Sequence, residues 1–164
     1  MSPFAPGALV AIALVLASTG VQLGLPDPRL TPGSSTPAVT QENIRYTICR
    51  PGWTQSLRAQ ASVQQALKVE LIGQYSYADK VPSHYALDSL IPMSLGGLSS
   101  DRKNSWPLPL EGEWSAKKKN ELENVLHTLV CNGQLPLHDA QTAISSNWIE
   151  AYKKYVPQQT RRHP

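Results

Sequence analysis

The clearest chemical pair in this 164-residue chain is a histidine close to an aspartate in a strand-like segment. His84 and Asp88 alternate with Ala86 in HYALDSLIPM (84–93), so both side chains would leave the same strand face and could meet. An imidazole in such a place can act as a general base. A single histidine at a strand edge is also commonly a hydrogen-bonded surface residue. The sequence has no glycine-rich phosphate loop, G-x-S-x-G elbow or HExxH zinc motif.

The two cysteines, Cys49 and Cys131, offer a second kind of chemistry. In an exported chain an even pair is most simply a disulfide. It would close a loop of about 80 residues and stabilise the fold by about 4 kcal/mol in the chain-entropy model. A zinc site is disfavoured because there is no Cys-x-x-Cys pair and no evident histidine partner. A catalytic thiol would fit an odd cysteine count better.

The length and composition of the chain favour a single small domain. The chain has 14 prolines and a single phenylalanine, and 16% of its residues are charged, against the usual quarter. Its formal net charge of +3 is too weak to hold a polyanion by itself, because non-specific nucleic-acid binding depends on many phosphate contacts. The composition therefore argues against a basic DNA-packaging protein.

Residues 1–24 have the pattern of an export signal. Every residue from 8 to 17 (ALVAIALVLA) is apolar, and small residues follow up to Gly20, where cleavage is plausible. No lysine or arginine precedes Arg29, and an uncleaved membrane anchor is the alternative. The segment predicts a secreted or periplasmic protein that contacts a membrane only if the signal is retained.

The rest of the chain divides by proline content and apolar periodicity. Residues 25–39 contain four prolines and no apolar period, which predicts a linker. Residues 40–156 form the expected folded domain. Residues 157–164 (PQQTRRHP) are expected to be a disordered tail.

Apolar periodicity within this domain predicts four helices, with a hairpin between the second and the third. The expected helices cover residues 41–49, 63–74, 116–131 and 139–152. The strand-like stretches are residues 84–93 and 104–109. This order predicts an α+β fold that is mostly helical, built around a hairpin followed by a helix and linked by one disulfide.

The third helix has the clearest amphipathic pattern. Its expected buried face consists of Leu122, Val125, Leu126, Leu129 and Val130. Lys117 to Lys119 fall on the predicted outer face with Glu121 and Glu123, in i,i+4 pairs worth a few tenths of a kcal/mol each. The lysines are therefore interpreted as a solvated helix face rather than a phosphate clamp.

Three segments carry a combined pattern: YALDSLIPMSLGG (85–97), KNSWPLP (103–109) and KNELENVLHTLVCNG (119–133). Together they resemble a group of secreted bacterial proteins related to HNH nucleases. In that group the corresponding segments read YELDHLIPLELGG, NLWPEP and KDxLExxLHxxVCxG. The likeness covers nearly the whole folded part, including both cysteines. It implies a ββα-metal finger, in which a hairpin and a helix hold one divalent cation.

The resemblance also implies a role for each matching residue. The hairpin aspartate helps to hold Mg²⁺ or a similar ion, the next histidine is the general base, and an asparagine beyond the loop orients that histidine or braces the hairpin. Asp88 matches the metal aspartate and Asn104 the asparagine, but Ser89 stands where the histidine belongs. Three positions have lost the acid of the family: Ala86, Ser94 and Asn120.

These departures predict a nuclease scaffold without cleavage chemistry. A serine hydroxyl is not a base near pH 7 unless another group accepts its proton, and one remaining carboxylate holds Mg²⁺ weakly. Asp88 and Asn120 are therefore expected to form a weak or lost metal site. The expected function is a binding module for nucleic acid or a partner protein, with no bound cofactor. The alternative is an active endonuclease that uses Mg²⁺ or another divalent cation, with His84 as a substitute base.

Overall fold

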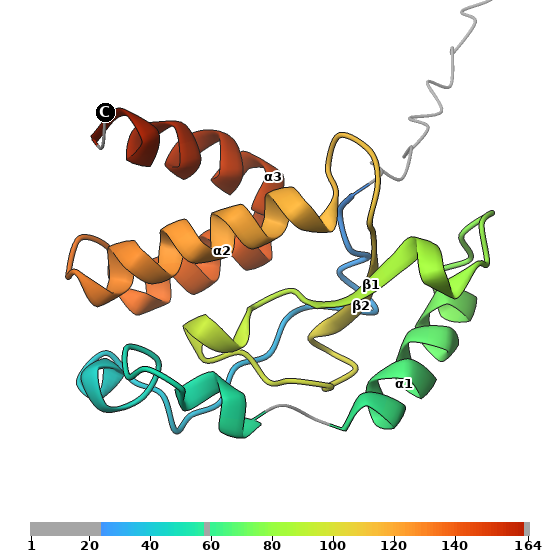
Figure 1. Cartoon of the computed structure of the whole chain (residues 1–164), viewed down its shortest axis with the longest axis horizontal. Coiled ribbons are helices and arrows are strands. Elements are labelled where there is room, and N and C mark those ends of the chain that lie inside the picture. Colours follow the sequence, from blue (N-terminus) through green and yellow to red (C-terminus); the bar gives the residue numbers. More distant parts are fainter. Residues whose placement is uncertain (1–23, 58–59, 163–164) are drawn as a thin grey trace, which may run out of the picture.

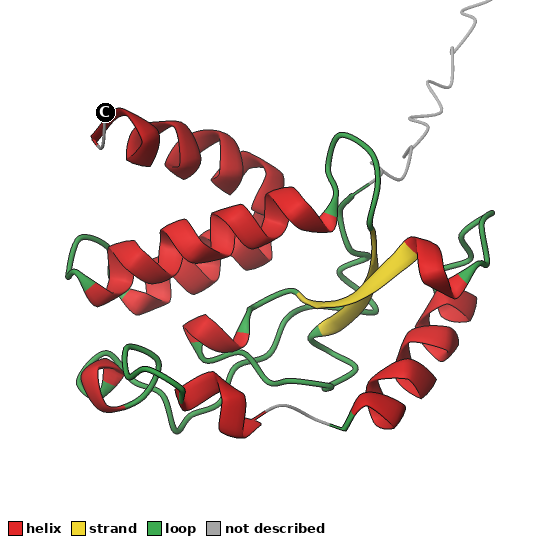
Figure 2. Ribbon diagram, in the orientation of Figure 1, coloured by secondary structure: helices red, strands yellow, loops and turns green. Residues whose placement is uncertain are grey.

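The computed structural model describes residues 24–57 and 60–162, so almost all of the predicted export signal lies outside the described residues. The described part is an α+β domain, as predicted, with an antiparallel hairpin between helices (Figures 1 and 2). Its main elements are α1 (Ala61–Gln74), β1 (Tyr85–Ser89), β2 (Ser105–Pro109), α2 (Ala116–Cys131) and α3 (Leu137–Arg162). Short 3-10 helices lie at Ile44–Tyr46 (η1), Trp53–Leu57 (η2), Pro82–His84 (η3) and Met93–Leu95 (η4). Within these described ranges no helix is both long and apolar enough to cross a bilayer.

The hairpin lies between two helical parts. Helix α1 packs against both strands, while α2 packs against α3 on the other side of the hairpin (Figure 1). The register pairs Tyr85 with Pro109 and Asp88 with Trp106. Both prolines of β2 are tolerated because a two-stranded sheet leaves one edge of each strand without ladder hydrogen bonds. Both strands fall within the predicted stretches.

Two of the predicted helices differ from those in the structure. The helix expected at 41–49 is reduced to η1. The Asn43 side chain accepts a hydrogen bond from Thr40 N–H and donates one to the Ala38 carbonyl, and these local bonds compete with those of a helix. Helix α3 is longer than expected but is broken at Asn147, whose backbone is extended. The Asn147 carboxamide oxygen accepts hydrogen bonds from Ile149 and Glu150 N–H, so it caps the second half of α3.

The segment predicted to be a linker, residues 25–39, instead packs along the domain. Thr31 is buried, with its hydroxyl 2.6 Å from the Tyr75 hydroxyl and donating to the Ser105 carbonyl. Ser35 forms an isolated bridge with Gly97. Composition missed these contacts because hydrogen bonds to a neighbouring loop need no apolar periodicity. The expected tail also begins inside α3, which includes Pro157 and ends at Arg162.

The main core joins α2 and α3 to the hairpin and its loop. Trp106 and Trp148 are fully buried at its centre, and Leu122, Leu126 and Val130 of α2 are buried beside them, as the amphipathic pattern predicts. The predicted disulfide between Cys49 and Cys131 is confirmed. It ties the loop after η1 to the last residue of α2.

Candidate functional site

The candidate site begins with the one carboxylate that survives from the implied metal site. Asp88 is the fourth residue of β1 and is 8% exposed. The indole Nε1–H of its cross-strand partner, Trp106, donates to Asp88 Oδ1 at 3.1 Å. The hairpin therefore presents Asp88 to the interior rather than to solvent.

Lys119, in the first turn of α2, completes the site. Its ammonium nitrogen lies 2.7 Å from Asp88 Oδ1 and 2.6 Å from Glu123 Oε1, and it donates to the Ser89 carbonyl at 2.8 Å. The Lys119 side chain has no solvent exposure. We refer to Asp88, Lys119 and Glu123 as the Asp–Lys–Glu cluster.

The prediction that Lys119 belongs to a solvated helix face is wrong. Lys119 lies three residues before Leu122 and seven before Leu126, so the helical period places it on the buried face, over which the hairpin packs. The charge of the residue hid this signal, because lysine is rarely buried without partners. Lys117 is exposed, as expected.

The cluster holds two carboxylates and one ammonium, an excess of one negative charge when all three ionise. Burial alone would lower the pKa of Lys119, but attraction by Asp88 and then Glu123 outweighs burial and raises that pKa. Burial raises the pKa of Glu123 to about 7, and repulsion from Asp88 adds to the effect, despite the attraction of Lys119. Glu123 is therefore the member of the cluster whose ionised form destabilises the folded state.

Glu123→Gln should change how stability depends on pH. Because the pKa of Glu123 is about 7 in the folded protein and 4.5 is its ordinary value, the folded state holds the proton more tightly. Glu123 therefore disfavours the folded state progressively as pH rises from about 4.5 to 7, by at most about 3 kcal/mol. Glu123→Gln should flatten this part of the curve in urea unfolding from pH 4 to 8. The exposed Glu121→Gln variant is the control, and an unchanged pH slope in Glu123→Gln would contradict the expectation.

The histidine proposed as a substitute base lies at the other end of β1. His84 is the last residue of η3, not part of the strand, and its Nδ1 lies 2.6 Å from Asp79 Oδ2. Four residues of extended chain separate it from Asp88, a span of about 13 Å. The structure thus pairs His84 with Asp79 and does not bring it to the Asp–Lys–Glu cluster.

The matching asparagine, Asn104, is fully buried and makes a complete set of hydrogen bonds. Its Oδ1 accepts from the N–H groups of Ile91 and Ser34, and its Nδ2 donates to the carbonyls of Ile91 and Leu98. Asn104 therefore braces the loop between the strands. Asn120, by contrast, is exposed on α2. Ser89 is half-buried, and its carbonyl, rather than its hydroxyl, contacts Lys119.

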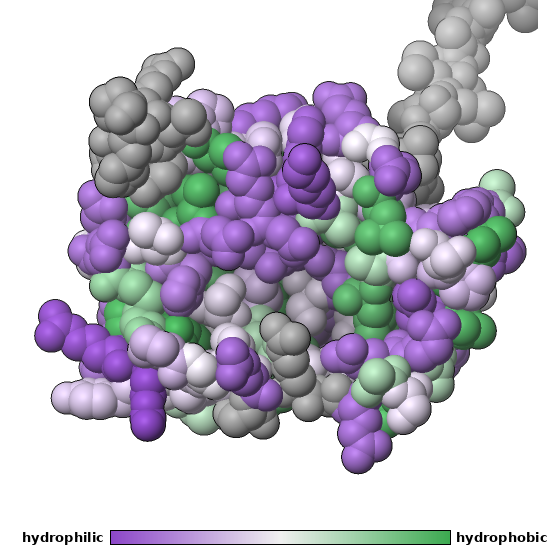
Figure 3. Space-filling model, viewed as in Figure 1, coloured by the Kyte–Doolittle hydropathy of each residue, from purple (hydrophilic) through white to green (hydrophobic). Residues whose placement is uncertain are grey.

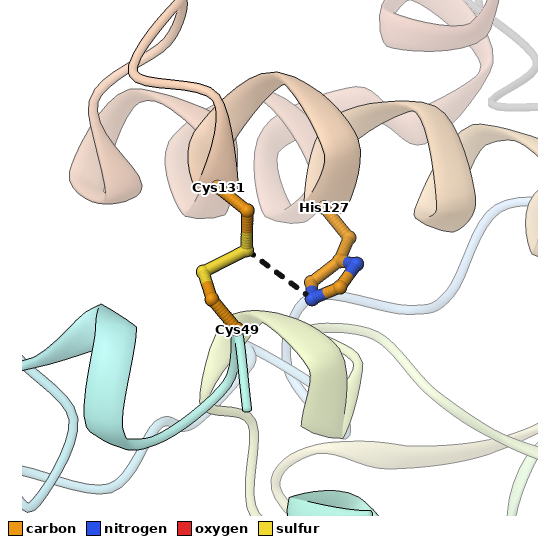
Figure 4. A group of neighbouring side chains, drawn as sticks. All are labelled: Cys49, His127 and Cys131. Carbon is orange, nitrogen blue, oxygen red and sulfur yellow. Dashed lines mark hydrogen bonds between the residues drawn. A yellow bond between two sulfur atoms is a disulfide. The ribbon is translucent and has the colours of Figure 1, made fainter. Parts of the chain in front are cut away.

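One further group of metal-ligating side chains occurs within the described residues. Cys49, His127 and Cys131 have ligand atoms within 4.8 Å of one another, but both sulfurs belong to the disulfide (Figure 4). His127 Nε2 lies 2.9 Å from the Ile48 carbonyl and 3.4 Å from Cys131 Sγ. His127 lies one helical turn before Cys131, where its position near the apolar stripe of the helix favours a packing role over catalysis. The group is a structural crosslink with an imidazole packed against it.

No family model, curated protein or solved structure matches this chain in sequence or fold comparison. The fold and the site define a small α+β domain that contains one disulfide and a buried Asp–Lys–Glu cluster between a hairpin and a helix.

Proposed function

We propose that this protein is an exported binding module on an HNH-like ββα scaffold that does not cleave nucleic acid. One observation carries the proposal: Asp88, at the implied metal position, is followed by Ser89, and no described histidine contacts it. Metal-assisted hydrolysis needs an accessible cation and a group that deprotonates water. The surroundings of Asp88 favour neither.

The ammonium of Lys119 lies beside Asp88, at the implied cation position. Lys119 places a positive charge among three oxygens, those of Asp88, Glu123 and the Ser89 carbonyl. Hard divalent cations prefer such oxygen ligands, so the ammonium competes with Mg²⁺ for the same atoms. The helix motif of the similar nuclease group also has lysine and glutamate at positions 119 and 123. Because these nucleases share the buried pair, the proposed loss of the cation site rests on Ser89 and on the acids missing at positions 86, 94 and 120, not on Lys119.

The positions of the histidines support the loss of the general base. Within the described residues, His84 contacts Asp79, His127 contacts the Ile48 carbonyl, and His138 is exposed near the start of α3. No contact joins any of these three to Asp88. Among the residues that the structure describes, no basic group is hydrogen-bonded to the Ser89 hydroxyl, so none would let it activate water.

The cellular location forms part of the same proposal. A disulfide is stable in oxidising compartments, and the apolar residues 8–17 are typical of an export signal. Secretion or periplasmic residence follows from the two together. A partner of such a module is either nucleic acid or another exported protein.

A plasmid-nicking assay tests whether the protein cleaves nucleic acid. The oxidised protein should show no nicking with Mg²⁺ or Mn²⁺ beyond an EDTA control. Ser89→His alone should remain nearly inactive, because it restores the imidazole and not the missing acids; Ser89→Ala is the matched control. Metal-dependent nicking that is lost in a folded Asp88→Asn variant would instead establish an active endonuclease. Strong nicking by Ser89→His would show that the acids missing at positions 86, 94 and 120 are not needed for cleavage.

A further inference from the structure

A tyrosine-lined cavity lies at the end of the hairpin remote from the Asp–Lys–Glu cluster. It has a volume of about 370 Å³, and its walls include Tyr75, Tyr77, Tyr85, Asp79 and Pro109. This volume suits a small organic ligand. Hydrophobic areas interrupt an otherwise mostly hydrophilic surface over the hairpin and the loop after β2 (Figure 3).

Internal hydrogen bonds hold the three tyrosines in place. The Tyr77 hydroxyl donates to the Pro107 carbonyl, and the Tyr85 hydroxyl donates to the Asp79 carbonyl. The Tyr75 hydroxyl lies 2.6 Å from that of Thr31. The rings of Tyr75 and Tyr77 have centroids 5.4 Å apart, and those of Tyr77 and Tyr85 lie 5.3 Å apart and stack. Because the hydroxyls are already bonded, the rings form a prearranged wall with little free hydrogen-bonding capacity.

Two carboxylates, those of Asp79 and Glu111, lie beside this wall. A second cavity of about 420 Å³ shares Asp79, Tyr85 and Pro109 with the first and adds Glu111 and His84. No lysine or arginine among the described residues lines either cavity. The nearby Lys68 and Lys80 donate to backbone carbonyls instead. The aromatic wall thus lies beside two carboxylates, and backbone carbonyls hold the two nearby ammonium groups.

We propose that this cavity binds a small organic cation of the trimethylammonium type. Aromatic faces attract cations through their quadrupole, and a neighbouring carboxylate adds to the attraction. A primary ammonium needs several hydrogen-bond acceptors, but both oxygens of Asp79 already have partners, Val81 N–H and His84. A trimethylammonium group needs none. The inference goes beyond the binding role proposed above, because a small organic cation is neither nucleic acid nor a protein, and this cavity lies apart from the Asp–Lys–Glu cluster.

Calorimetric titration of the oxidised protein with three matched probes tests this inference. Choline is the trimethylammonium probe, ethanolamine is its primary-amine analogue, and 3,3-dimethylbutan-1-ol is its neutral isostere. Choline should bind saturably and about 10-fold more tightly than either of the other two. If the neutral isostere binds as tightly as choline, the cavity recognises apolar shape and not charge. If ethanolamine binds as tightly, the aromatic rings do not select the trimethylammonium group. Either result overturns the proposal. Absence of choline binding also overturns it.

Substitutions in the cavity wall test whether choline binds at this cavity. Tyr77→Leu should weaken choline binding at least about fivefold because it removes a ring, whereas Tyr77→Phe should retain it. Asp79→Asn should weaken binding about threefold, since an exposed carboxylate acts through water. Glu113→Gln, exposed and outside both cavities, is the control. Unchanged affinity in Asp79→Asn and in a folded Tyr77→Leu variant would refute the site. The nicking assay is independent, so loss of this assignment leaves the conclusion about catalysis unaffected.

Discussion

Lys119→Met is expected to lower the free energy of unfolding by about 3–5 kcal/mol. The change preserves most of the volume of the side chain but removes the ammonium that lies between Asp88 and Glu123. Two carboxylates would then face each other in a buried place with no cation. Since breaking a buried ion pair from one side leaves uncompensated charge, the loss should far exceed that of a surface pair. Urea unfolding at pH 8 measures it.

Two comparisons isolate the cause of this loss. Lys117→Met, on the exposed part of the same helix, should change stability by no more than about 0.5 kcal/mol. Adding Glu123→Gln to Lys119→Met should recover part of the loss, because one carboxylate then remains. If Lys119→Met costs less than about 1 kcal/mol, the ammonium does not hold this cluster together. Lowering the pH should also recover stability in Lys119→Met, because protonation removes the uncompensated charge.

The elements that position the site follow from local sequence. Alternation in residues 84–93 predicts β1, and the apolar period from Leu122 to Val130 predicts α2. The boundaries of α2 agree with the prediction because Ser115 precedes the helix and Gly133, with φ of +70°, follows it, whereas β1 is shorter than the predicted stretch 84–93. Such signals act within one or two turns of chain. The packing of residues 25–39 on the hairpin depends on contacts with Tyr75, Gly97 and Ser105, distant in sequence, and local composition carries no trace of them.

The chemistry of the site was harder to predict than its framework. The hairpin motif predicts that Asp88 belongs to the site. The charge of its partner, Lys119, instead favours a solvent-exposed position. A helical wheel places Lys119 on the same face as Leu122 and Leu126. The helical period alone therefore predicts that position 119 is buried, and only the charge of lysine argues against it. The partner of His84 was missed for another reason. A turn brings Asp79 to His84, and alternation along a strand cannot describe a residue in a 3-10 helix.

The second large effect concerns the disulfide. The double variant Cys49→Ala, Cys131→Ala should lose about 4 kcal/mol, because the crosslink joins residues 82 apart and restricts the unfolded chain. Native protein should contain no thiol that reacts with a labelling reagent, since the described residues include no free cysteine. Urea unfolding of the double variant, of reduced wild type and of oxidised wild type gives the comparison.

The crosslink acts on a specific part of the domain. Cys49 follows η1 in a segment that buries Ile44 and Ile48, whereas Cys131 ends α2, which buries six of its residues. Reduction should therefore expose the loop around Cys49 before α2 unfolds, which amide hydrogen exchange resolves. Reduced wild type and the double variant should agree in stability, since both lack the same constraint. If the double variant were as stable as oxidised wild type, the packing of Ile44 and Ile48 alone would hold this loop, and the crosslink would be incidental to the fold.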